Sequence, residues 1–567
     1  MMMMLLMDKI ALALAKALAL PEAEIRPLLE YPPDEELGDV AFPCFTLART
    51  MKQSPASIAA WLEPLLADAG WSVRAAGPYL NFKWNRELAA AQLIADWKSG
   101  TLMHAAIGNG ERVIIDMSSP NIAKPFGIGH LRSTMIGNAL YHILRKVGYE
   151  TVSVNHLGDW GTQFGKMITA YLKWGDEQQL AADPIKGYLE LYVRFHEEAE
   201  QHPALEDEAR SWFAKLEAGD AEAIRCWSQF IADSLKEFNK LYARLGVSFD
   251  HFLGESFYND KMDAVVQQLQ EQQLLEESEG AQVVRLDEHE LPPCLIRKSD
   301  GTSIYATRDL ATAIYRHEEM KGSELLYVVG SEQSLHFRQL FLVLEKMGFA
   351  WAAACKHIPF GLMKLDGQKM STRRGKVVFL EEVLDEAVQR ALQKIEEKNP
   401  ALAGKAEVAE AVGIGAVVFG DLKNTRLLAV DFVLEDVLNF EGETGPYVQY
   451  AYARTQRILA KAAGSDVAAA PQPADYEYVT GDYAWLLMKM LLRYTAVLGD
   501  AAKRHEPSIL ARYLIQLAQA FNRFYHHDKV LAGDAGERIV KLKLVQVAAD
   551  VLKEGLELLG LKTPKEI

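Results

Sequence analysis

The tightest constraint on the fold of this chain is a strand–helix–strand pattern that lies between residues 112 and 154. Residues 112–116 (Arg-Val-Ile-Ile-Asp) form a short apolar run of the kind that fills a buried strand. Residues 130–147 place apolar side chains on one helical face, and Gly148 follows as a C-terminal stop. Residues 151–154 are again strand-like. Two strands joined by a helix predict a βαβ unit and therefore a parallel sheet.

The chain is long enough for several domains around this unit. A length of 567 residues exceeds what a single hydrophobic core usually supports. Segments at 325–329 and around 357–365 are predicted to be further buried strands of the same domain, whereas residues 166–250 are predicted to form a helical insertion. We therefore predict a multidomain α/β protein with a Rossmann-type parallel-sheet domain. The predicted regions are an α+β domain at 1–105, the Rossmann-type domain at 106–385, a helical connection at 386–445 and an all-α domain at 446–567.

Charge and hydropathy exclude several classes of protein. The 61 Lys and Arg residues and 77 Asp and Glu residues give a net charge of −16, so a nucleic acid must meet a local basic face. No apolar run is as long as the roughly 18 residues of a membrane span. Asp8, Lys9 and Lys16 interrupt the apolar start at helical spacing, which favours an amphipathic helix over a signal peptide. We expect a cytoplasmic protein with no membrane contact.

The four cysteines are far apart in the sequence. Cys44, Cys226, Cys294 and Cys355 form no Cys-x-x-Cys pair. This spacing argues against a zinc site and against a disulfide framework, and it is typical of a protein from a reducing compartment. We therefore expect no metal site built from protein ligands.

A glycine-containing loop follows the first strand of the βαβ unit. Gly127 and Gly129 allow the backbone to approach a flat ligand closely, and the N-terminus of the following helix offers amide donors to phosphate. Lys124, His130 and Arg132 add donors near the same point. A dinucleotide fingerprint would require a third glycine where Arg132 stands, which disfavours a nicotinamide-dependent oxidoreductase.

A second basic segment lies at 361–376. It follows a predicted strand and carries Lys369, Arg373, Arg374 and Lys376, which would suit a mobile cationic cover for a polyphosphate. A solvated basic loop without a ligand is the alternative interpretation, because isolated charge runs commonly have that role.

Taken together, the two segments resemble the two signatures of class I aminoacyl-tRNA synthetases. Residues 127–130 (Gly-Ile-Gly-His) stand where the HIGH motif belongs, and residues 369–373 (Lys-Met-Ser-Thr-Arg) stand where KMSKS belongs. Other segments narrow the resemblance to the arginyl-tRNA synthetase family, and they cover nearly the whole chain. These segments are 118–124, 129–134, 155–165, 298–301, 305–310, 330–339, 441–454 and 521–525.

Two positions depart from the family pattern. Gly127 replaces the first histidine of HIGH, and Thr372 replaces the second lysine of KMSKS. Arg373 and Arg374 offer substitute charge near the second position, although an arginine fork is not equivalent to a lysine point charge. These departures bear on the rate of activation rather than on the assignment.

The resemblance implies positions for the nucleotide and for the reacting groups. The residues implied as catalytic are Lys124, His130, Lys369 and Arg373, and those implied to bind ATP are Gly127, Gly129, His130, Lys369, Met370 and Ser371. His156 lies in a matching segment, where a nucleotide contact and a structural role are equally consistent with the sequence.

The resemblance also implies an arginine site. Its residues are Asp116, Asn121, Tyr305, Asp309 and Gln333. A guanidinium group is a planar cation with donors in a fixed fork, so carboxylates in its plane and a wall that excludes water would recognise it. Lysine lacks the fork and would leave buried acceptors unpaired. By themselves, Asp309 would equally suit a helix N-cap and Tyr305 a core aromatic.

For RNA, the resemblance implies contacts at both ends of the chain. The N-terminal domain would meet the outer corner of tRNA, and the C-terminal helical domain would read the anticodon loop by stacking and phosphate contacts. The candidate tRNA-binding residues are Tyr79, Asn81, Phe82, Tyr447, Tyr450, Arg454 and Asn522. At helical spacing most aromatic side chains belong to the core, and Phe82 suits a core position equally well.

The implied function is ATP-dependent ligation of L-arginine to tRNA(Arg) through an arginyl-adenylate. The resemblance implies that Mg²⁺ neutralises the triphosphate and that bound tRNA is needed for the first step. A monomer is expected. Three alternatives remain at this point: a cysteine or glutamate synthetase of the same fold, a non-catalytic tRNA-binding paralogue, which Gly127 would suit, and the oxidoreductase already disfavoured.

Overall fold

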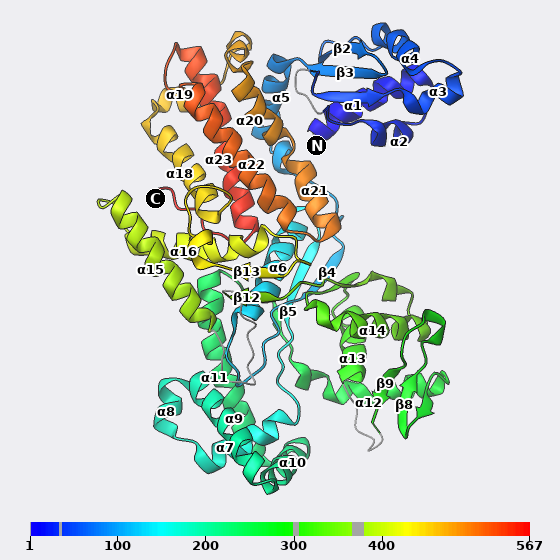
Figure 1. The fold of residues 1–567 in the computed structure, drawn as a ribbon, viewed down its shortest axis with the longest axis vertical. Helices are drawn as coiled ribbons and strands as arrows, with labels where there is room; N and C mark the ends of the chain where they lie inside the picture. Colours follow the sequence, from blue (N-terminus) through cyan, green and yellow to red (C-terminus); the bar gives the residue numbers. More distant parts are fainter. Residues whose placement is uncertain (1, 33–36, 299–304, 366–378) are drawn as a thin grey trace.

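The computed structural model describes residues 2–32, 37–298, 305–365 and 379–567. Within these residues the predicted fold class is confirmed: along the chain, an N-terminal α+β domain is followed by a domain with a parallel sheet and then by a helical C-terminal domain, whose helices lie beside the N-terminal domain (Figure 1). None of the helices in the described ranges combines the length and apolar character that a membrane crossing requires.

The N-terminal domain packs helices on a three-stranded antiparallel sheet of order β1-β3-β2. Gly77 has φ +57° and forms the tight turn between β2 and β3, where a left-handed backbone favours glycine. Phe42, Leu80 and Phe82 fill the core together with the inner face of α1. The elements are α1 (Met2–Leu18), α2 (Glu22–Ile25), β1 (Val40–Pro43), α3 (Phe45–Met51), α4 (Pro55–Leu62), β2 (Trp71–Ala76), β3 (Tyr79–Trp84) and α5 (Arg86–Lys98).

The central domain contains the predicted βαβ unit. Five parallel strands lie in the order β11-β10-β4-β5-β6, so that the chain leaves β4 toward β5 on one side and later returns to β10 on the other. Ligands of such sheets collect at the carboxyl ends of the strands where the order reverses. The elements are β4 (Arg112–Asp116), α6 (Ile128–Lys146), β5 (Glu150–Asn155), β6 (His251–Phe252), α13 (Tyr305–Glu318), β10 (Glu324–Tyr327), α14 (Ser334–Lys346) and β11 (Cys355–His357).

Two insertions interrupt this sheet. The helical insertion predicted at 166–250 is present. A second one, which the sequence reasoning missed, contains a three-stranded antiparallel sheet. The first comprises α7 (Gln163–Trp174), α8 (Glu177–Ala182), α9 (Pro184–Gln201), α10 (Ala204–Glu217) and α11 (Ala221–Leu245). The second comprises α12 (Met262–Glu271), β7 (Glu276–Ser278), β8 (Ala281–Val284) and β9 (Cys294–Arg297).

The predicted strand region at 357–365 divides into two parts. Cys355–His357 is β11 of the parallel sheet, but β12 (Met363–Leu365) leaves it and pairs with β13 (Val430–Phe432). Pro359 lacks an amide donor, and Gly361 packs so closely on Leu428 that a Cβ would lie 2.6 Å from its carbonyl carbon. The segment therefore contains strands, as predicted, but only β11 belongs to the parallel sheet.

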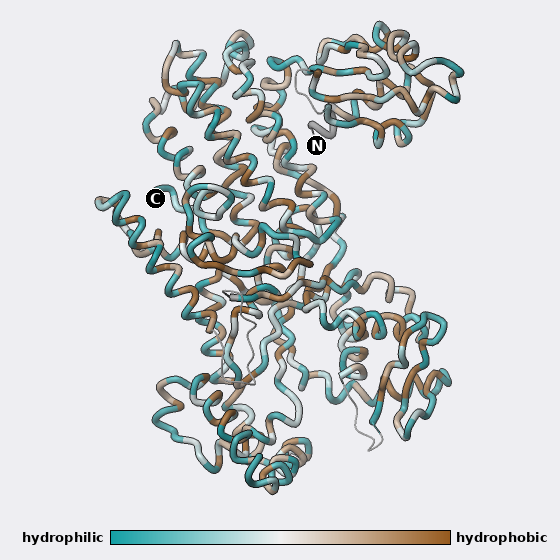
Figure 2. The backbone as a smooth tube through the Cα atoms, in the orientation of Figure 1, coloured by the Kyte–Doolittle hydropathy of each residue, from teal (hydrophilic) through white to brown (hydrophobic). Residues whose placement is uncertain are grey.

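The C-terminal third of the chain is helical. Figure 2 shows apolar residues running along α16, which is buried from Ala409 to Leu422, while helices of the first insertion are more polar. Trp485 donates from Nε1 to Asp39 at 2.8 Å and thereby joins this domain to the N-terminal one. The helices are α15 (Leu380–Lys398), α16 (Lys405–Leu422), α17 (Leu434–Val437), α18 (Gly445–Lys461), α19 (Gly464–Ala468), α20 (Asp482–Leu492), α21 (Tyr494–Arg504), α22 (Ser508–His527) and α23 (Ala535–Leu558).

Candidate active site

The loop that follows β4 carries unusual backbone geometry. Ser118, Ser119 and Ala123 have φ values of +73°, +50° and +56°, a region that side chains other than glycine occupy at a cost in strain. Hydrogen bonds hold this conformation: the Ser118 amide donates to Ser133 Oγ at 3.0 Å, and Ser119 Oγ donates to Asp116 Oδ1 at 2.8 Å. The loop is thus fixed to the end of β4 and to the first turns of α6.

The N-terminus of α6 is arranged as the sequence predicted for an anion-binding helix end. Gly127 is the N-cap, and its amide donates to Nδ1 of His130 at 3.2 Å, so the ring proton lies on Nε2. Burial lowers the pKa of His130, and the charge of Lys124 lowers it further. A neutral imidazole with a free Nε2–H can donate a hydrogen bond to a phosphate oxygen.

Lys124 and Gly129 border the same helix end. The Lys124 ammonium donates to Gln163 Oε1 at 3.1 Å and lies 5.3 Å from the ring centroid of Tyr192. Gly129 is exposed, and a Cβ built on it would meet nothing within 4 Å. The space beside this turn is therefore open to an approaching group.

Asp116 lies at the carboxyl end of β4, beside Tyr327 at the end of β10. Its Oδ2 accepts a hydrogen bond from Arg316 Nη1 at 2.8 Å, and both side chains are buried, at 8% and 1% exposure. The Arg316 guanidinium also lies 5.3 Å from the ring centroid of Tyr327. The first predicted guanidinium-binding carboxylate therefore already has an arginine of this chain as its partner.

Asp309 lies within α13 and does not cap that helix. Its Oδ2 is 2.6 Å from Nε2 of His336 on α14. Burial lowers the pKa of His156, whereas the charges of Asp116 and Asp309 raise it, which places both carboxylates near one imidazole. We call Asp116, Arg316, Asp309 and His336 the carboxylate cluster.

The other predicted arginine contacts are distributed around this cluster. Asn121 pairs with Gly158 through an isolated parallel bridge, where a Cβ on residue 158 would lie 2.2 Å from Asn121 Oδ1. Tyr305 begins α13 with 65% of its surface exposed, and Gln333 is exposed directly before α14. Lys369, Met370, Ser371 and Arg373, the predicted residues of the second signature, lie outside the described residues.

Sequence reasoning missed the two cationic partners in the cluster. Arg316 lies seven residues after Asp309, so both side chains occupy one face of α13, and this spacing was the available signal. His336 lies in a segment whose resemblance was noted, but nothing in its spacing points to Asp309. Glu255 was also missed; its carboxylate lies 3.2 Å from Arg308 Nη1, and burial raises its pKa to about 7.

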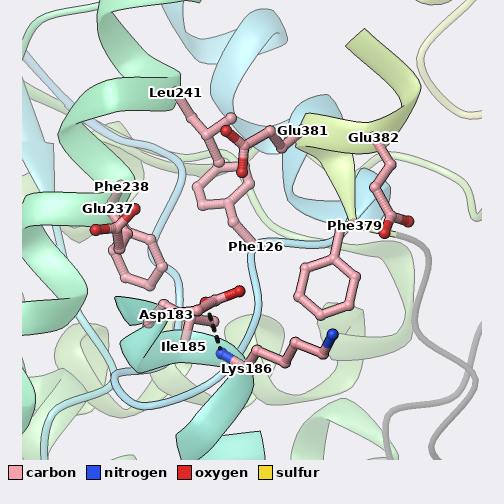
Figure 3. Close-up of a pocket in the computed structure, with 10 residues that line it drawn as sticks. All are labelled: Phe126, Asp183, Ile185, Lys186, Glu237, Phe238, Leu241, Phe379, Glu381 and Glu382. Atoms are coloured by element: carbon pink, nitrogen blue, oxygen red, sulfur yellow. Dashed lines mark hydrogen bonds between the residues drawn. The ribbon is translucent and has the colours of Figure 1, made fainter. Parts of the chain in front are cut away.

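A separate cavity of about 190 Å³ lies beside the first signature loop, between the start of α9, α11 and the start of α15 (Figure 3). Phe126, Phe238 and Phe379 line it together with acidic side chains and Lys186. Phe379 pairs with Gly127 through an isolated antiparallel bridge. None of the predicted site residues that the structure describes lines this cavity, and no member of the carboxylate cluster does.

Four of the predicted RNA contacts meet on one face of the C-terminal domain. Asn522 on α22 donates from Nδ2 to the Tyr447 hydroxyl at 2.9 Å and accepts a hydrogen bond from Arg454. The Arg454 guanidinium lies 5.0 Å from the ring centroid of Tyr450 and 5.3 Å from that of Tyr525. We call Tyr447, Tyr450, Arg454, Asn522 and Tyr525 the tyrosine–arginine cluster.

The N-terminal candidates differ in their exposure. Tyr79 is half-buried, with its ring edge-on to that of Phe45 at 5.6 Å between centroids. Asn81 is 7% exposed, and Phe82 is fully buried in the domain core. Of the three, only Tyr79 presents substantial surface to a partner.

Comparison with known proteins is consistent with this geometry. The catalytic-domain model of class I tRNA synthetases (R) matches residues 93–434, the arginyl tRNA synthetase N-terminal domain matches residues 4–84, and the DALR anticodon-binding domain matches residues 448–567.

Individual relatives agree with the family models over almost the full chain. An arginine–tRNA ligase of Exiguobacterium sp. is 52% identical over 96% of both chains, and one of Enterococcus faecalis is 50% identical over the same shares. The solved arginyl-tRNA synthetase of Thermus thermophilus superposes with a TM-score of 0.83 at 26% identity, over 99% of both chains. The chain therefore belongs to the arginyl-tRNA synthetase family of class I aminoacyl-tRNA synthetases.

Proposed function

We propose that this chain ligates L-arginine to tRNA(Arg) in two steps that consume ATP. In the first step the arginine carboxylate attacks the α-phosphorus of ATP, which forms arginyl-adenylate and releases pyrophosphate. In the second step the terminal 2′-hydroxyl of tRNA attacks the adenylate carbonyl and releases AMP. The observation that carries the proposal is that Asp116, at the carboxyl end of β4, is hydrogen-bonded through Ser119 to the loop that leads into α6, and that Asp116 and Asp309 both act on the ring of His156.

No protein nucleophile is required, so catalysis consists of positioning and charge stabilisation. His130 offers Nε2–H and the α6 N-terminus, capped by Gly127, offers amides beside the place proposed for phosphates, with Gly129 leaving room. Lys124 adds positive charge at the same helix end. In this proposal Lys369, Met370, Ser371 and Arg373 of the second signature complete the phosphate contacts.

The arginine side chain would be recognised at the carboxylate cluster. Asp309 would accept the guanidinium fork, and Asp116, held by Arg316, would define the polar end of the site. Tyr305 and Asn121 would flank the substrate, and Gln333 would face its amino-acid end. A lysine side chain could not satisfy the same acceptors, and the site would therefore select arginine over lysine.

Mg²⁺ enters this proposal with the nucleotide. Among the described residues, no three or more His, Cys, Asp or Glu side chains lie close enough together to hold a metal ion. This arrangement fits an ion bound mainly by phosphate oxygens and water. When bound, Mg²⁺ would neutralise the triphosphate charge.

The two ends of the chain would hold the tRNA. The tyrosine–arginine cluster offers stacking surfaces and a cation to unpaired anticodon bases, and Tyr79 offers a smaller surface on the N-terminal domain. As in the family, bound tRNA would complete the site for the first step. We propose that the protein acts as a monomer in the cytoplasm.

The test is arginine-dependent ATP–pyrophosphate exchange with the purified full chain, with and without tRNA(Arg). We expect exchange that requires both arginine and tRNA. Asp309→Ala should abolish exchange while tRNA affinity is kept, whereas Glu318→Ala, an exposed carboxylate further along α13, should leave both unchanged. Tight tRNA binding without any exchange would instead favour a non-catalytic tRNA-binding paralogue.

A further inference from the structure

The two acids of the carboxylate cluster have partners of different chemistry. Asp116 is paired with Arg316, whose guanidinium keeps its charge at every pH a protein tolerates. Asp309 is paired with His336, whose imidazole can exist in either charge state near neutral pH. The two pairs also differ in burial, because the Asp309 and His336 side chains are 28% and 26% exposed, whereas those of Asp116 and Arg316 are almost fully buried.

Asp116 cannot exchange its partner without a large cost. Arg316 lies between Asp116 and the Tyr327 ring, and its removal would leave a charge unpaired in the protein interior. A substrate guanidinium can therefore be added beside this pair but cannot replace Arg316.

Asp309 is in the opposite situation. The Asp309 carboxylate is the only partner that the described residues provide for the His336 ring nitrogens, at 2.6 Å from Nε2. His336 is the third residue of α14, near the positive end of the helix dipole, which disfavours a cation there. Burial by itself would lower the pKa of His336, but the hydrogen bond and charge of Asp309 outweigh burial and raise the pKa above its ordinary value. Among the described residues, Asp309 is therefore the group that stabilises the imidazolium.

The other titratable groups around His336 do not replace this partner. His357 on β11 faces it, and the two imidazoles repel each other's charged forms; burial holds the pKa of His357 below its ordinary value. Cys294 on β9 feels the charge of Asp309, and burial raises its pKa to about 12, so its thiol stays neutral. Arg308 on α13 is occupied by Glu255.

We propose that His336 occupies the place on Asp309 that the guanidinium of arginine takes, and that arginine binding releases His336 as a neutral imidazole. This inference rests on the function proposed above. One cation replaces another on a single carboxylate, and the proton of the imidazolium passes from Nε2 to the solvent. Arginine binding is therefore coupled to proton release, and arginine affinity falls as the pH drops below the pKa of His336, approaching tenfold per pH unit.

The experiment is isothermal titration calorimetry of L-arginine into the full chain. At each pH between 5.5 and 8.0, titrations in two buffers that both have a pKa near that pH but differ in ionisation enthalpy give the number of protons released. The arginine α-ammonium stays protonated over most of this range. The wild-type chain should release a proton at low pH and lose affinity with decreasing pH. A wild-type chain that releases no proton overturns the proposal without any variant.

His336→Gln tests the role of the imidazole. The glutamine side-chain amide can still donate to Asp309, but it has no proton that titrates in this pH range. We expect no proton release from this variant and an affinity that changes less than about twofold over the same range. His357→Gln, which changes the neighbouring imidazole, should keep the wild-type proton release. Proton release that persists in His336→Gln overturns the proposal.

Asp309→Asn separates this inference from the function on which it rests. If Asp309→Asn binds arginine as tightly as the wild type, then the arginine site itself is misplaced. If Asp309→Asn loses arginine affinity while His336→Gln still releases a proton, then the site stands and only the role of His336 is refuted.

Discussion

The carboxylate cluster and the tyrosine–arginine cluster both pair charged groups with aromatic rings, but they do so in different surroundings. In the first, Arg316 and Asp116 are almost fully buried, and each is the other's ion-pair partner. In the second, Arg454 lies between two tyrosines that are each nearly two-fifths exposed, and its polar partner is a neutral amide. A charge in the first surroundings governs folding, whereas a charge in the second is free to govern binding.

This contrast follows from the cost of removing charges from water. A buried ion pair contributes little by its formation but leaves a severe penalty when one partner is lost. A half-exposed guanidinium between two rings keeps much of its hydration and can stack or contact phosphate when a partner arrives. Substitutions of Arg316 and of Arg454 should therefore separate stability from affinity.

The largest effect is expected from Arg316→Met. This change leaves the Asp116 carboxylate buried without its cation, and we expect a loss of about 3–5 kcal/mol in the free energy of unfolding of the catalytic domain. Urea unfolding followed by circular dichroism measures it. Arg112 lies on β4, the strand that carries Asp116, and forms a more exposed ion pair with Glu150 on β5. Arg112→Met breaks this pair and should change the unfolding transition far less. Equal losses in the two variants would contradict the contrast between buried and exposed charges.

A smaller effect is expected from Glu255→Gln, beside the carboxylate cluster. Burial raises the pKa of Glu255 to about 7, so between pH 4.5 and 7 the folded state holds a proton that the unfolded state has lost. This contribution to stability is present at low pH and declines as the pH rises through that window. The wild type should lose about 3 kcal/mol relative to the variant between pH 4.5 and 8, measured by urea unfolding at each pH. A difference that does not change with pH would show that Glu255 ionises normally in the folded protein.

In the tyrosine–arginine cluster, Arg454→Ala should weaken tRNA binding by about tenfold with little change in stability, because stacking and cation–π contacts are lost. Filter binding or fluorescence titration measures the dissociation constant. Arg457→Ala removes an exposed charge on the same helix outside the cluster. Both variants should make the tRNA dissociation constant less dependent on salt concentration. Only Arg454→Ala should also lose the affinity that comes from stacking. Equal losses of affinity in the two variants would show that the cluster contributes to tRNA binding only through its positive charge.

The smallest effect is expected in the N-terminal domain. Tyr79→Ala should raise the tRNA dissociation constant by less than about threefold, because a single half-buried ring offers a small stacking surface. Leu65→Ala, at an exposed apolar position of the same domain, serves as the control in the same titration. A loss larger than that of Arg454→Ala would move the principal RNA contact to the N-terminal domain.

Local patterns in the sequence were sufficient for the elements that position the site. The apolar run of β4, the glycine-bearing loop and the amphipathic face of α6 lie where they were predicted, because strand and helix periodicity are properties of neighbouring residues. The same patterns indicated strands around 357–365 but not which sheet each one joins, because Pro359 and the close packing of Gly361 lead the chain to β13. Local patterns did not reveal the small sheet β7-β8-β9, whose short strands carry little periodicity.

The sequence by itself determined which chemical groups this chain possesses and, through periodicity and motif spacing, which element carries each one. Only the tertiary structure decided which charges meet. Arg316 reaches Asp116 across 200 residues of chain, and His336 reaches Asp309 across 27. The physical reason is that the charge of a side chain depends on its residue type alone, whereas its partner depends on packing. A buried carboxylate requires a nearby cation, and the packing of the helices determines which cation that is.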